Sequence, residues 1–343
     1  MSVGEELQRP DGSAASAEGG GTGGAQNKSA LSIAVRERLG SQAVVYLIFL
    51  AVVLFFVFAA PAFASLPSLA NIGRQAAAIT VVSVGMTVVI VCAEIDLSVG
   101  SAASLCGMLA GVFLSDGWPW PVAVLAVLGI GAAIGFINGF ITAYVGVPSF
   151  LVTLGMLSVL AAVALMITNT ASVPITNNGF LAVLGPLSFA AIPLPVWWGI
   201  AVVLIGIYLL HFSVFGRHVF ATGGSRGAAL YSGINTRKVV LASFVLCGIL
   251  AAFAGLLIAG RSEAANPTVG VGMELSAIAA VILGGTDLFG GRGTVLGTVA
   301  GAIFIGVVGI GLILMGAGAQ MQDLITGVII IGAVSINKLG KRT

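Results

Sequence analysis

The sequence predicts an all-α fold, a polytopic transmembrane helical bundle of about ten spans with both termini in the cytoplasm. Of its 343 residues, 58% are hydrophobic and only 8% are charged, and the mean hydropathy is +1.14. A soluble domain carries about 25% charged residues because its surface faces water. Most of this surface must therefore face lipid, where helices satisfy their own backbone hydrogen bonds.

The first 42 residues differ from the rest in composition. Residues 1–42 are rich in Gly, Ser, Ala and charge, and include the run GSAASAEGGGTGGAQ. So little apolar surface predicts a disordered cytoplasmic tail. The first apolar run begins near Val44, too late for a signal peptide. We expect a transmembrane domain over 43–337 and a short cytoplasmic tail over 338–343.

Apolar runs follow one another closely after the tail. A helix needs about 20 apolar residues to cross the bilayer core. Spans are predicted near 43–64, 75–93, 97–115, 121–144, 149–168, 193–212, 239–260, 275–286, 294–314 and 320–337. The run 275–286 is short and is expected to be tilted, broken or re-entrant. The stretch 169–192 is too polar at its start to span, and is expected to be a loop with a short surface helix.

The basic residues set the orientation, because Lys and Arg concentrate in cytoplasmic loops. With a cytoplasmic N-terminus and ten spans, only Arg74 and Arg261 fall outside. The inside then holds Arg9, Lys28, Arg36, Arg38, Arg217, Arg226, Arg237, Lys238, Arg292, Lys338, Lys341 and Arg342. Twelve against two supports this topology.

One cytoplasmic connection, residues 213–238, stands out by its length. It holds four of the basic residues, and a short helix is predicted around Ser225–Ser232. A loop of this length inside a compact domain is usually functional. The alternative is a merely solvated basic loop.

Two segments share a pattern. CAEIDLSVGSAAS and LGGTDLFGGRGTV both contain Asp-Leu followed by Gly three residues after the Leu, and Asp96 and Asp287 are 191 residues apart (287 − 96). Both are expected at the cytoplasmic side. An internal duplication and a chance match in a Gly-rich chain both remain open.

Placing Glu94 and Asp96 in lipid would be energetically unfavourable. Each acidic side chain at the bilayer centre costs about 2.5–3.5 kcal/mol. They must therefore lie in a turn, in a cavity or against donor groups. Asp96 either caps the following helix or belongs to a polar lining near a substrate path.

A few polar side chains inside the spans could contact a polar solute. Asn138 lies beside a ladder of glycines, Gly131, Gly135 and Gly139, whose spacing is typical of close-packed helix faces. Phe150 and Thr153 could add an apolar face and a hydroxyl. The alternative for Asn138 and Thr153 is that each holds two helices together.

Three charges, Arg261, Glu263 and Glu274, are expected to cluster outside, before the short span. They form either a solvated loop or a contact with an extracellular partner.

Signatures of soluble catalysis are lacking in the sequence. There is no phosphate-binding G-x-x-x-x-G-K-[ST] loop, and neither His211 nor His218 has partners at metal-ligand spacing. The three cysteines fit small buried residues better than disulfides. We expect no catalytic residues, no cofactor, no metal and no nucleic-acid partner.

The C-terminal half resembles a known family. The segments GRHVFATGGSRGAALYSGINTRKVVLASFVLCGILAAFAGLLIAGR and ELSAIAAVILGGTDLFGGRGTVLGT are similar to the permeases of the ribose/xylose/arabinose type of ATP-binding cassette (ABC) transporter. EIDLSVGS and VPSFLVTLGML resemble that family's N-terminal motifs. The resemblance covers about residues 43–337.

The resemblance implies a homodimeric or pseudo-dimeric pore in the inner membrane. Its partners would be a cytoplasmic ABC ATPase, an extracytoplasmic sugar-binding protein and a second permease copy. Coupling to the ATPase would involve Gly216, Arg217, Gly223, Gly224, Ala228, Ala229, Gly233 and Asn235. The translocation path would include Asp96, Ser98, Asn138, Phe150 and Thr153, and a structural motif would comprise Asp287, Gly290, Gly291 and Arg292.

The chain departs from the family pattern at two places. Ser225, Arg226 and Gly227 precede the Ala-Ala pair, where polar or acidic residues are usual, and Ala93 and Glu94 stand where small residues usually precede Ile-Asp. The first departure puts specific charge contacts with the ATPase in doubt, and the second bears on the choice of substrate.

The function that we expect is that of the permease subunit of an ABC importer for a monosaccharide or related polyol. Two alternatives are an ion-coupled secondary transporter and a non-transporting membrane anchor for a soluble partner. Secondary transporters usually bury ionisable residues near the midplane, and none is found well inside a long span.

Overall fold

The computed structural model describes residues 47–339, except for the side chains of 319, 323, 330 and 333–339. The predicted tail, 1–42, lies outside the described residues. The chain divides into two units, Met1–Ile48 and Phe49–Thr343, and the fold described below is that of the second, whose first helix begins two residues earlier, at Leu47.

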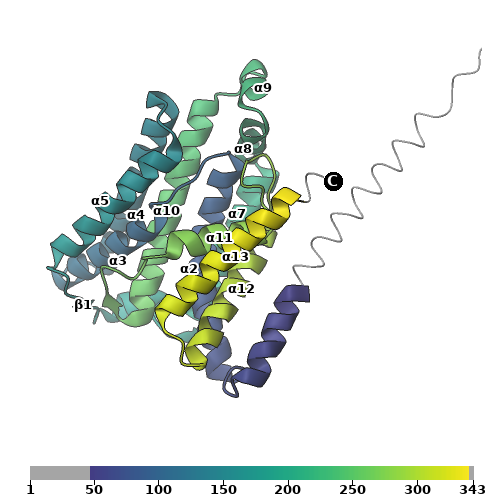
Figure 1. The fold of residues 1–343 in the computed structure, drawn as a ribbon. Helices are drawn as coiled ribbons and strands as arrows, with labels where there is room; N and C mark the ends of the chain where they lie inside the picture. The colour runs from purple at the N-terminus through teal and green to yellow at the C-terminus, as the bar shows by residue number, and fades with distance from the viewer. Residues whose placement is uncertain (1–46, 340–343) are drawn as a thin grey trace, which may run out of the picture. The chain divides into compact units, whose positions relative to one another are not determined.

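The second unit is a bundle of helices (Figure 1). A first helix over Leu47–Ala59 precedes α2 (Leu66–Val91), α3 (Val99–Ser115), α4 (Trp120–Phe140), η1 (Ile141–Val145), α5 (Ser149–Ile167), α6 (Asn178–Leu184), α7 (Leu194–Ile207), η2 (Tyr208–Phe212), α8 (Val214–Gly224), α9 (Arg226–Tyr231), α10 (Thr236–Ser262), α11 (Met273–Leu283), α12 (Val295–Leu314) and α13 (Ala319–Leu339). Here η1 and η2 are π-helical ends of α4 and α7.

Six helices are long and apolar enough to cross a membrane: Leu66–Val91, Trp120–Val145, Ser149–Ile167, Leu194–Phe212, Thr236–Ser262 and Val295–Leu314. Leu47–Ala59, Val99–Ser115 and Met273–Leu283 are shorter apolar helices. An all-α membrane bundle is therefore confirmed.

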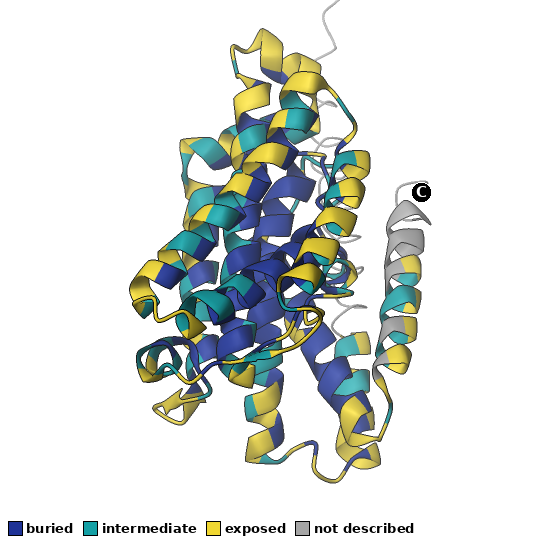
Figure 2. Cartoon of the chain, turned by 90° about the vertical axis from the view of Figure 1, so that its left-hand side faces the viewer, coloured by how far each residue is buried: buried dark blue, intermediate teal, exposed yellow. Residues whose placement is uncertain are grey.

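Helix α2 forms the centre of the bundle. Every residue from Ala76 to Val91 is buried, and the helix contacts α7, α10, α11 and α12. A helix that is apolar on all sides is stable only when other helices surround it. Figure 2 shows this buried interior enclosed by more exposed outer helices.

Glycines set the close approach of α4 and α10. A Cβ atom at Gly131 would lie 2.5 Å from the carbonyl oxygen of Gly248, and one at Gly135 would overlap the carbonyl of Phe244. Small residues let helices pack closely in lipid, where no hydrophobic force draws them together. The glycine ladder predicted from the sequence is confirmed as a packing face.

The outer helices present apolar side chains outward. On α5, only Ser149, Thr153, Leu160 and Ala164 are buried, whereas Leu151, Leu154, Val159, Val163 and Met166 are exposed. In water such a surface would be an interaction patch. In a chain with membrane-spanning helices an apolar face of this kind suits contact with lipid.

The connections gather at two ends of the bundle. One, here named the coupling end, contains residues 92–98, 146–149, 213–238 and 284–294. The opposite end contains two short antiparallel strand pairs. In these, β1 (Val173–Pro174) pairs with β4 (Ala264–Ala265), and β2 (Ser188–Phe189) pairs with β3 (Ile192–Pro193).

The predicted spans match the helices apart from their ends. Helix α2 begins at Leu66 rather than near 75, because Ser65 caps it by accepting a hydrogen bond from the amide of Ser68. Between 169 and 192 the predicted short helix is α6. In the 213–238 connection the sequence predicted one helix, but there are two, since α8 precedes α9.

Candidate coupling and transport site

Three capping side chains shape the 213–238 connection. The Ser213 hydroxyl accepts a hydrogen bond from the amide of Gly216 at 3.1 Å and starts α8. Ser225 does the same for α9, accepting from the amide of Ala228 at 3.3 Å. The side chain of Asn235 accepts from the amide of Lys238 at 3.1 Å and starts α10. These caps satisfy helix amides that would otherwise lack partners, so the segment is an ordered pair of helices.

The far end of α8 packs against two other segments of the coupling end. Gly223 lies so close to the carbonyl oxygen of Val91, at the end of α2, that a Cβ atom would overlap it. The same carbonyl accepts a hydrogen bond from the amide of Gly291 at 2.8 Å. A Cβ atom at Gly290 would lie 2.6 Å from the Cβ of Ala93. The end of α8, the end of α2 and the turn before α12 therefore pack against one another at glycine residues, where no side chain separates the backbones.

Asp287 organises that turn. Its carboxylate accepts a hydrogen bond from the amide of Phe289 at 3.1 Å, and its own amide donates to the carbonyl of Arg292 at 3.0 Å. Asp96 makes the same kind of contact: its carboxylate accepts a hydrogen bond from the amide of Ser98, two residues further along the chain, at 2.9 Å. The two Asp-Leu motifs thus share a local geometry, and their origin by duplication stays a prediction.

A buried polar network follows Asp96. The Ser98 hydroxyl donates to the Asp96 carboxylate at 2.6 Å, and the Asn138 side-chain amide donates to that hydroxyl at 2.9 Å. All three side chains are buried. Burial raises the pKa of the Asp96 carboxyl, and the hydrogen bonds from Ser98 and Asn138 oppose that rise.

Of the two roles predicted for Asp96, the cap of α3 is not formed. Its carboxylate accepts a hydrogen bond from the amide of Ser98, which precedes α3, and not from amides inside the helix. The network instead ties the α2–α3 connection to α4. Near it, Thr153 donates to the carbonyl of Ser149 at 2.9 Å and approaches that of Ile95 at 3.3 Å. Asn138 and Thr153 thus hold helices and loops together in this structure, while Phe150 is half exposed.

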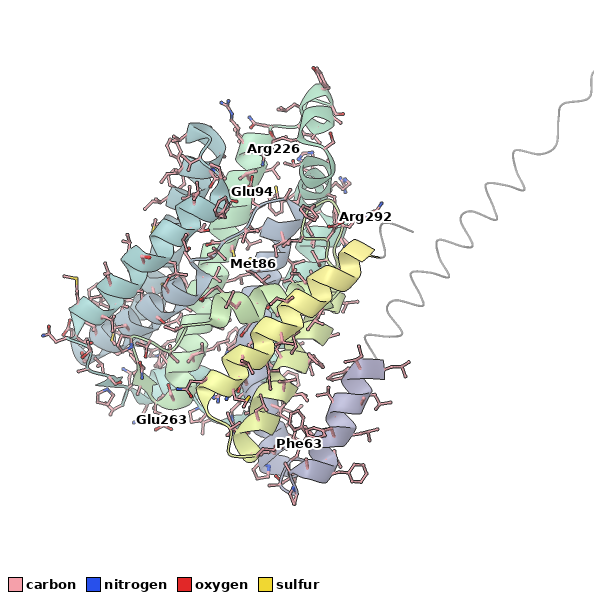
Figure 3. The ribbon with its side chains drawn as sticks, in the orientation of Figure 1. Phe63, Met86, Glu94, Arg226, Glu263 and Arg292 are labelled. Atoms are coloured by element: carbon pink, nitrogen blue, oxygen red, sulfur yellow. The ribbon has the colours of Figure 1, made fainter. Side chains whose placement is uncertain are left out.

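An ion pair joins α9 to the α2–α3 connection. Arg226 pairs with Glu94, which is 9% exposed, while Arg226 is 50% exposed. Figure 3 shows both at the same end of the bundle, with Glu263 and Phe63 at the other end. Both residues are among those by which the sequence departs from the family pattern, but nothing in the sequence indicates that they pair.

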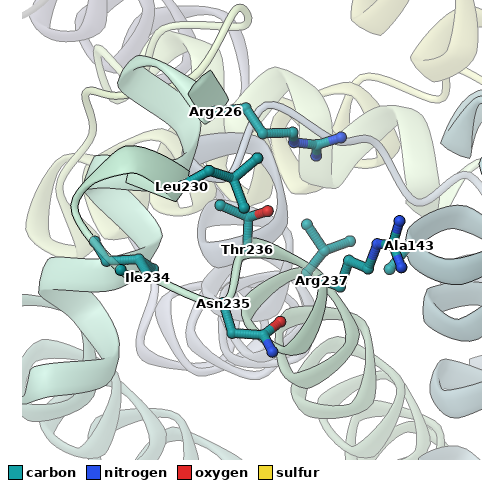
Figure 4. Close-up of a pocket in the computed structure, with 9 residues that line it drawn as sticks. Ala143, Arg226, Leu230, Ile234, Asn235, Thr236 and Arg237 are labelled. Atoms are coloured by element: carbon teal, nitrogen blue, oxygen red, sulfur yellow. The ribbon is translucent and has the colours of Figure 1, made fainter. Parts of the chain in front are cut away.

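Two grooves flank this ion pair. One of about 600 Å³ is lined by Ala143, Arg226, Leu230, Gly233, Ile234, Asn235, Thr236, Arg237 and Val240 (Figure 4). The other, about 440 Å³, is lined by Ala93, Glu94, Ile95, Pro148, Ser149, Phe150, Leu288 and Phe289. The first groove therefore opens beside α9 and the second between the two Asp-Leu connections.

The predicted coupling residues lie on this end of the bundle. Gly216 and Ala229 are buried, and Gly223 is half-buried. Arg217, Gly224, Ala228, Gly233 and Asn235 are exposed. On α9 two large apolar side chains also face outward, Leu230 at 55% and Tyr231 at 97% exposure.

Comparison with known proteins decides the family. Residues 68–334 match the family described as the permease component of the branched-chain amino acid transport system, which is 267 (334 − 68 + 1) of the 343 residues. The chain belongs to this family of membrane permeases. No solved structure matches.

Curated relatives are permeases as well. The ribose import permease protein RbsC of Escherichia coli K12 is 40% identical over 283 residues, covering 81% of this permease and 87% of the relative. The probable ABC transporter permease protein YphD of the same organism is 39% identical over 289 residues (84% and 87%). The autoinducer 2 import system permease protein LsrC of Salmonella paratyphi B is 33% identical over 288 residues (83% and 83%). This permease is a multi-pass protein of the inner membrane.

One expected cluster is wrong. Glu274 does not lie beside Arg261 and Glu263, because its carboxylate lies against Gly100 in the first turn of α3. Glu263 instead ends α10 at the opposite end of the bundle. The chain between them, 264–272, enters the bundle. Its Asn, Pro, Thr and Gly residues are typical of an external loop, so no feature of the sequence indicated this path.

Proposed function

We propose that this permease forms, with a second copy, the pore of an ABC importer that carries a monosaccharide or related polyol. An extracytoplasmic binding protein would deliver the cargo, and a separate cytoplasmic ATPase would drive the cycle. The cargo class is supported by the names of relatives such as the ribose permease. The family description names amino acids instead, so the family alone leaves the cargo open.

The observation that carries the proposal is the packing of α8 and α9. Through Gly223, Gly291 and the Arg226–Glu94 pair, the helices of the 213–238 connection contact the C-terminal end of α2, the α2–α3 connection and the turn before α12. Movement of α8 would therefore reach central helices directly. Switching by rigid movement of packed helices needs such contacts between the driven segment and the core.

We propose ten spans, made by Leu47–Ala59 and by α2, α3, α4, α5, α7, α10, α11, α12 and α13. The coupling end would face the cytoplasm with both termini, because Arg217, Arg226, Arg237, Lys238 and Arg292 belong to it. Arg74 and Arg261 belong to the opposite end. The positive-inside rule supports this orientation. The domains would be the tail 1–42, the permease domain 43–337 with its coupling segment 213–238, and the tail 338–343.

Reconstitution tests the function. In vesicles holding this permease, its ATPase and its binding protein, we expect uptake of radiolabelled ribose or another pentose only when ATP is supplied on the coupling side. An imposed ion gradient without ATP should drive none. Uptake that follows the ion gradient and ignores ATP would establish a secondary transporter. No uptake of any sugar or polyol under either condition would favour a membrane anchor.

The exposed tip of α9 should bind the ATPase. Replacing Leu230 and Tyr231 by Ser removes apolar area that is already exposed, so the fold should persist while binding is lost. A pull-down of the purified permease with its ATPase should recover little ATPase. Deleting Gly223–Gly233 should have the same effect.

The matched control replaces Leu187 and Phe189, which are similarly exposed at the opposite end, by Ser. This variant should bind ATPase normally. Normal recovery by the Leu230/Tyr231 variant, or loss in both variants, would contradict the assignment of α9.

A further inference from the structure

The chain between α10 and α11 enters the bundle without forming a helix. At the opposite end, a Cβ atom at Gly111 would lie 2.5 Å from the Cβ of Ala265. Five residues later the amide of Gly270 donates to the Ser104 hydroxyl at 2.8 Å, and Gly270 packs directly on the backbone of Gly100.

These contacts give the depth of entry. Gly100 and Gly111 are 11 residues apart on α3 (111 − 100), which is about 16 Å along a helix at 1.5 Å per residue. The segment 266–272 therefore runs about that far along α3, roughly half of a 30 Å hydrocarbon core. Helix α11, of 11 residues, begins there, so the proposed span at this place consists of α11 together with the segment that precedes it.

One side of this segment is buried on α3 and the other is open. Pro267, Gly270 and Met273 are buried, whereas Asn266, Thr268, Val269, Val271 and Leu275 are exposed. Val271 reaches 73% exposure. The open side thus carries two polar side chains among apolar ones.

Lipid is a poor solvent for this open side. Irregular backbone occurs at membrane depth only where it is buried in protein or lines a water-filled cavity, because each unsatisfied backbone group costs several kcal/mol in hydrocarbon. The lipid-facing helix α5, in contrast, keeps its backbone bonded within the helix. The exposed side chains of α5 are mainly apolar.

We propose that residues 266–275 line the translocation path and that Asn266 and Thr268 bind hydroxyl groups of the cargo. This rests on the proposed transport function. The Asn266 side-chain oxygen accepts from the amide and the hydroxyl of Thr268, each at 2.9 Å. That turn holds both exposed side chains together on the open side. Val271 and Leu275 supply apolar surface for the C–H face of a sugar.

Thiol labelling tests the proposal in the full complex in vesicles. The native cysteines, Cys92, Cys106 and Cys247, are buried, so the background is low. Asn266→Cys, Thr268→Cys and Val271→Cys should react with a charged, membrane-impermeant methanethiosulfonate at least about tenfold faster than Val159→Cys on α5, because thiols ionise and react only where water reaches them. Val159→Cys should react with a lipid-soluble maleimide.

Two results would overturn the proposal. Reaction of the three cysteines with the lipid-soluble reagent alone would place this side in lipid. Oxidative cross-linking of two permease copies through them, with no labelling in the uncross-linked protein, would make it an interface between copies. The labelling does not depend on transport. Labelled cysteines in a complex that takes up no sugar would therefore support the aqueous path and contradict the proposed cargo.

Discussion

Gly223→Ala is expected to abolish ATP-driven uptake, although alanine is normally the better helix residue. The added methyl group would overlap the carbonyl of Val91 and lie 2.9 Å from the amide nitrogen of Gly291. It would therefore break the hydrogen bond between those two groups. Overpacking costs about 1–3 kcal/mol, and the lost hydrogen bond adds about 1 kcal/mol.

The measurement is thermal unfolding of the purified permease together with uptake in vesicles. A loss of about 2–4 kcal/mol corresponds to a Tm lower by roughly 3–6 °C, because the entropy of unfolding is about 2.1 cal/mol/K per residue and the chain has 343 residues. If the protein relieves the clash by shifting α8, Tm will fall less, but coupling to α2 is lost and uptake still fails.

The control is the neighbouring Gly224→Ala. No atom lies within 4 Å of a Cβ placed at Gly224 or at Gly227. At these positions alanine should be neutral, or stabilising by up to about 1 kcal/mol. Equal Tm and equal uptake for Gly223→Ala and Gly224→Ala would show that the contact between α8 and α2 does not exist.

Composition and hydropathy predicted most of the fold because they show which parts of the chain face lipid or protein and which face water. The low charge content excluded a water-soluble domain, and the apolar runs located the helices to within a few residues at most ends. The exception is the start of α2, where Ser65 and the following Leu-Pro extend the helix beyond its apolar run.

Helix α8 escaped prediction for a local reason. Gly216, Gly223 and Gly224 give its sequence the composition of a loop, and glycine disfavours a helix by up to about 1 kcal/mol per residue. The helix forms because Ser213 caps it and because Val219 and Thr222 are buried on its inner side. Two of the same glycines are what allow the backbone contacts: Gly216 lies on the carbonyl of Leu210 and Gly223 on that of Val91.

The sequence predicted the segments that form the candidate site but not that they lie together. The motifs around Asp96 and Asp287 and the 213–238 connection were found in the sequence, but their meeting at one end depends on contacts across more than 100 residues. Glu94 and Arg226 are 132 residues apart, so no periodicity links them. The path of 264–272 into the bundle depends on Gly100 and Gly270, whose backbones approach only in the folded state.

Reversing the charge of Glu94 is expected to uncouple ATP hydrolysis from transport. In Glu94→Arg two cations would face each other between α9 and the α2–α3 connection, in place of the pair with Arg226. A hydrogen bond to a charged partner is worth about 1.5–3 kcal/mol, so its loss in one conformation should change the equilibrium between states about tenfold or more. Uptake should fall while the ATPase activity of the complex continues.

The double variant Glu94→Arg with Arg226→Glu distinguishes coupling from simple destabilisation. It restores an attractive pair with the charges exchanged, and we expect it to recover most of the uptake that Glu94→Arg and Arg226→Glu lose singly. Lys238→Glu, a reversal of an exposed charge in the first turn of α10 that is not among the predicted coupling residues, serves as the control for altered charge at this end. If the double variant transports no better than the single ones, the pair is not part of the coupling. The same follows if Lys238→Glu is equally impaired, because the net charge of this end would then explain the loss. Recovery in the double variant alone would show that α9 drives the α2–α3 connection through this one contact.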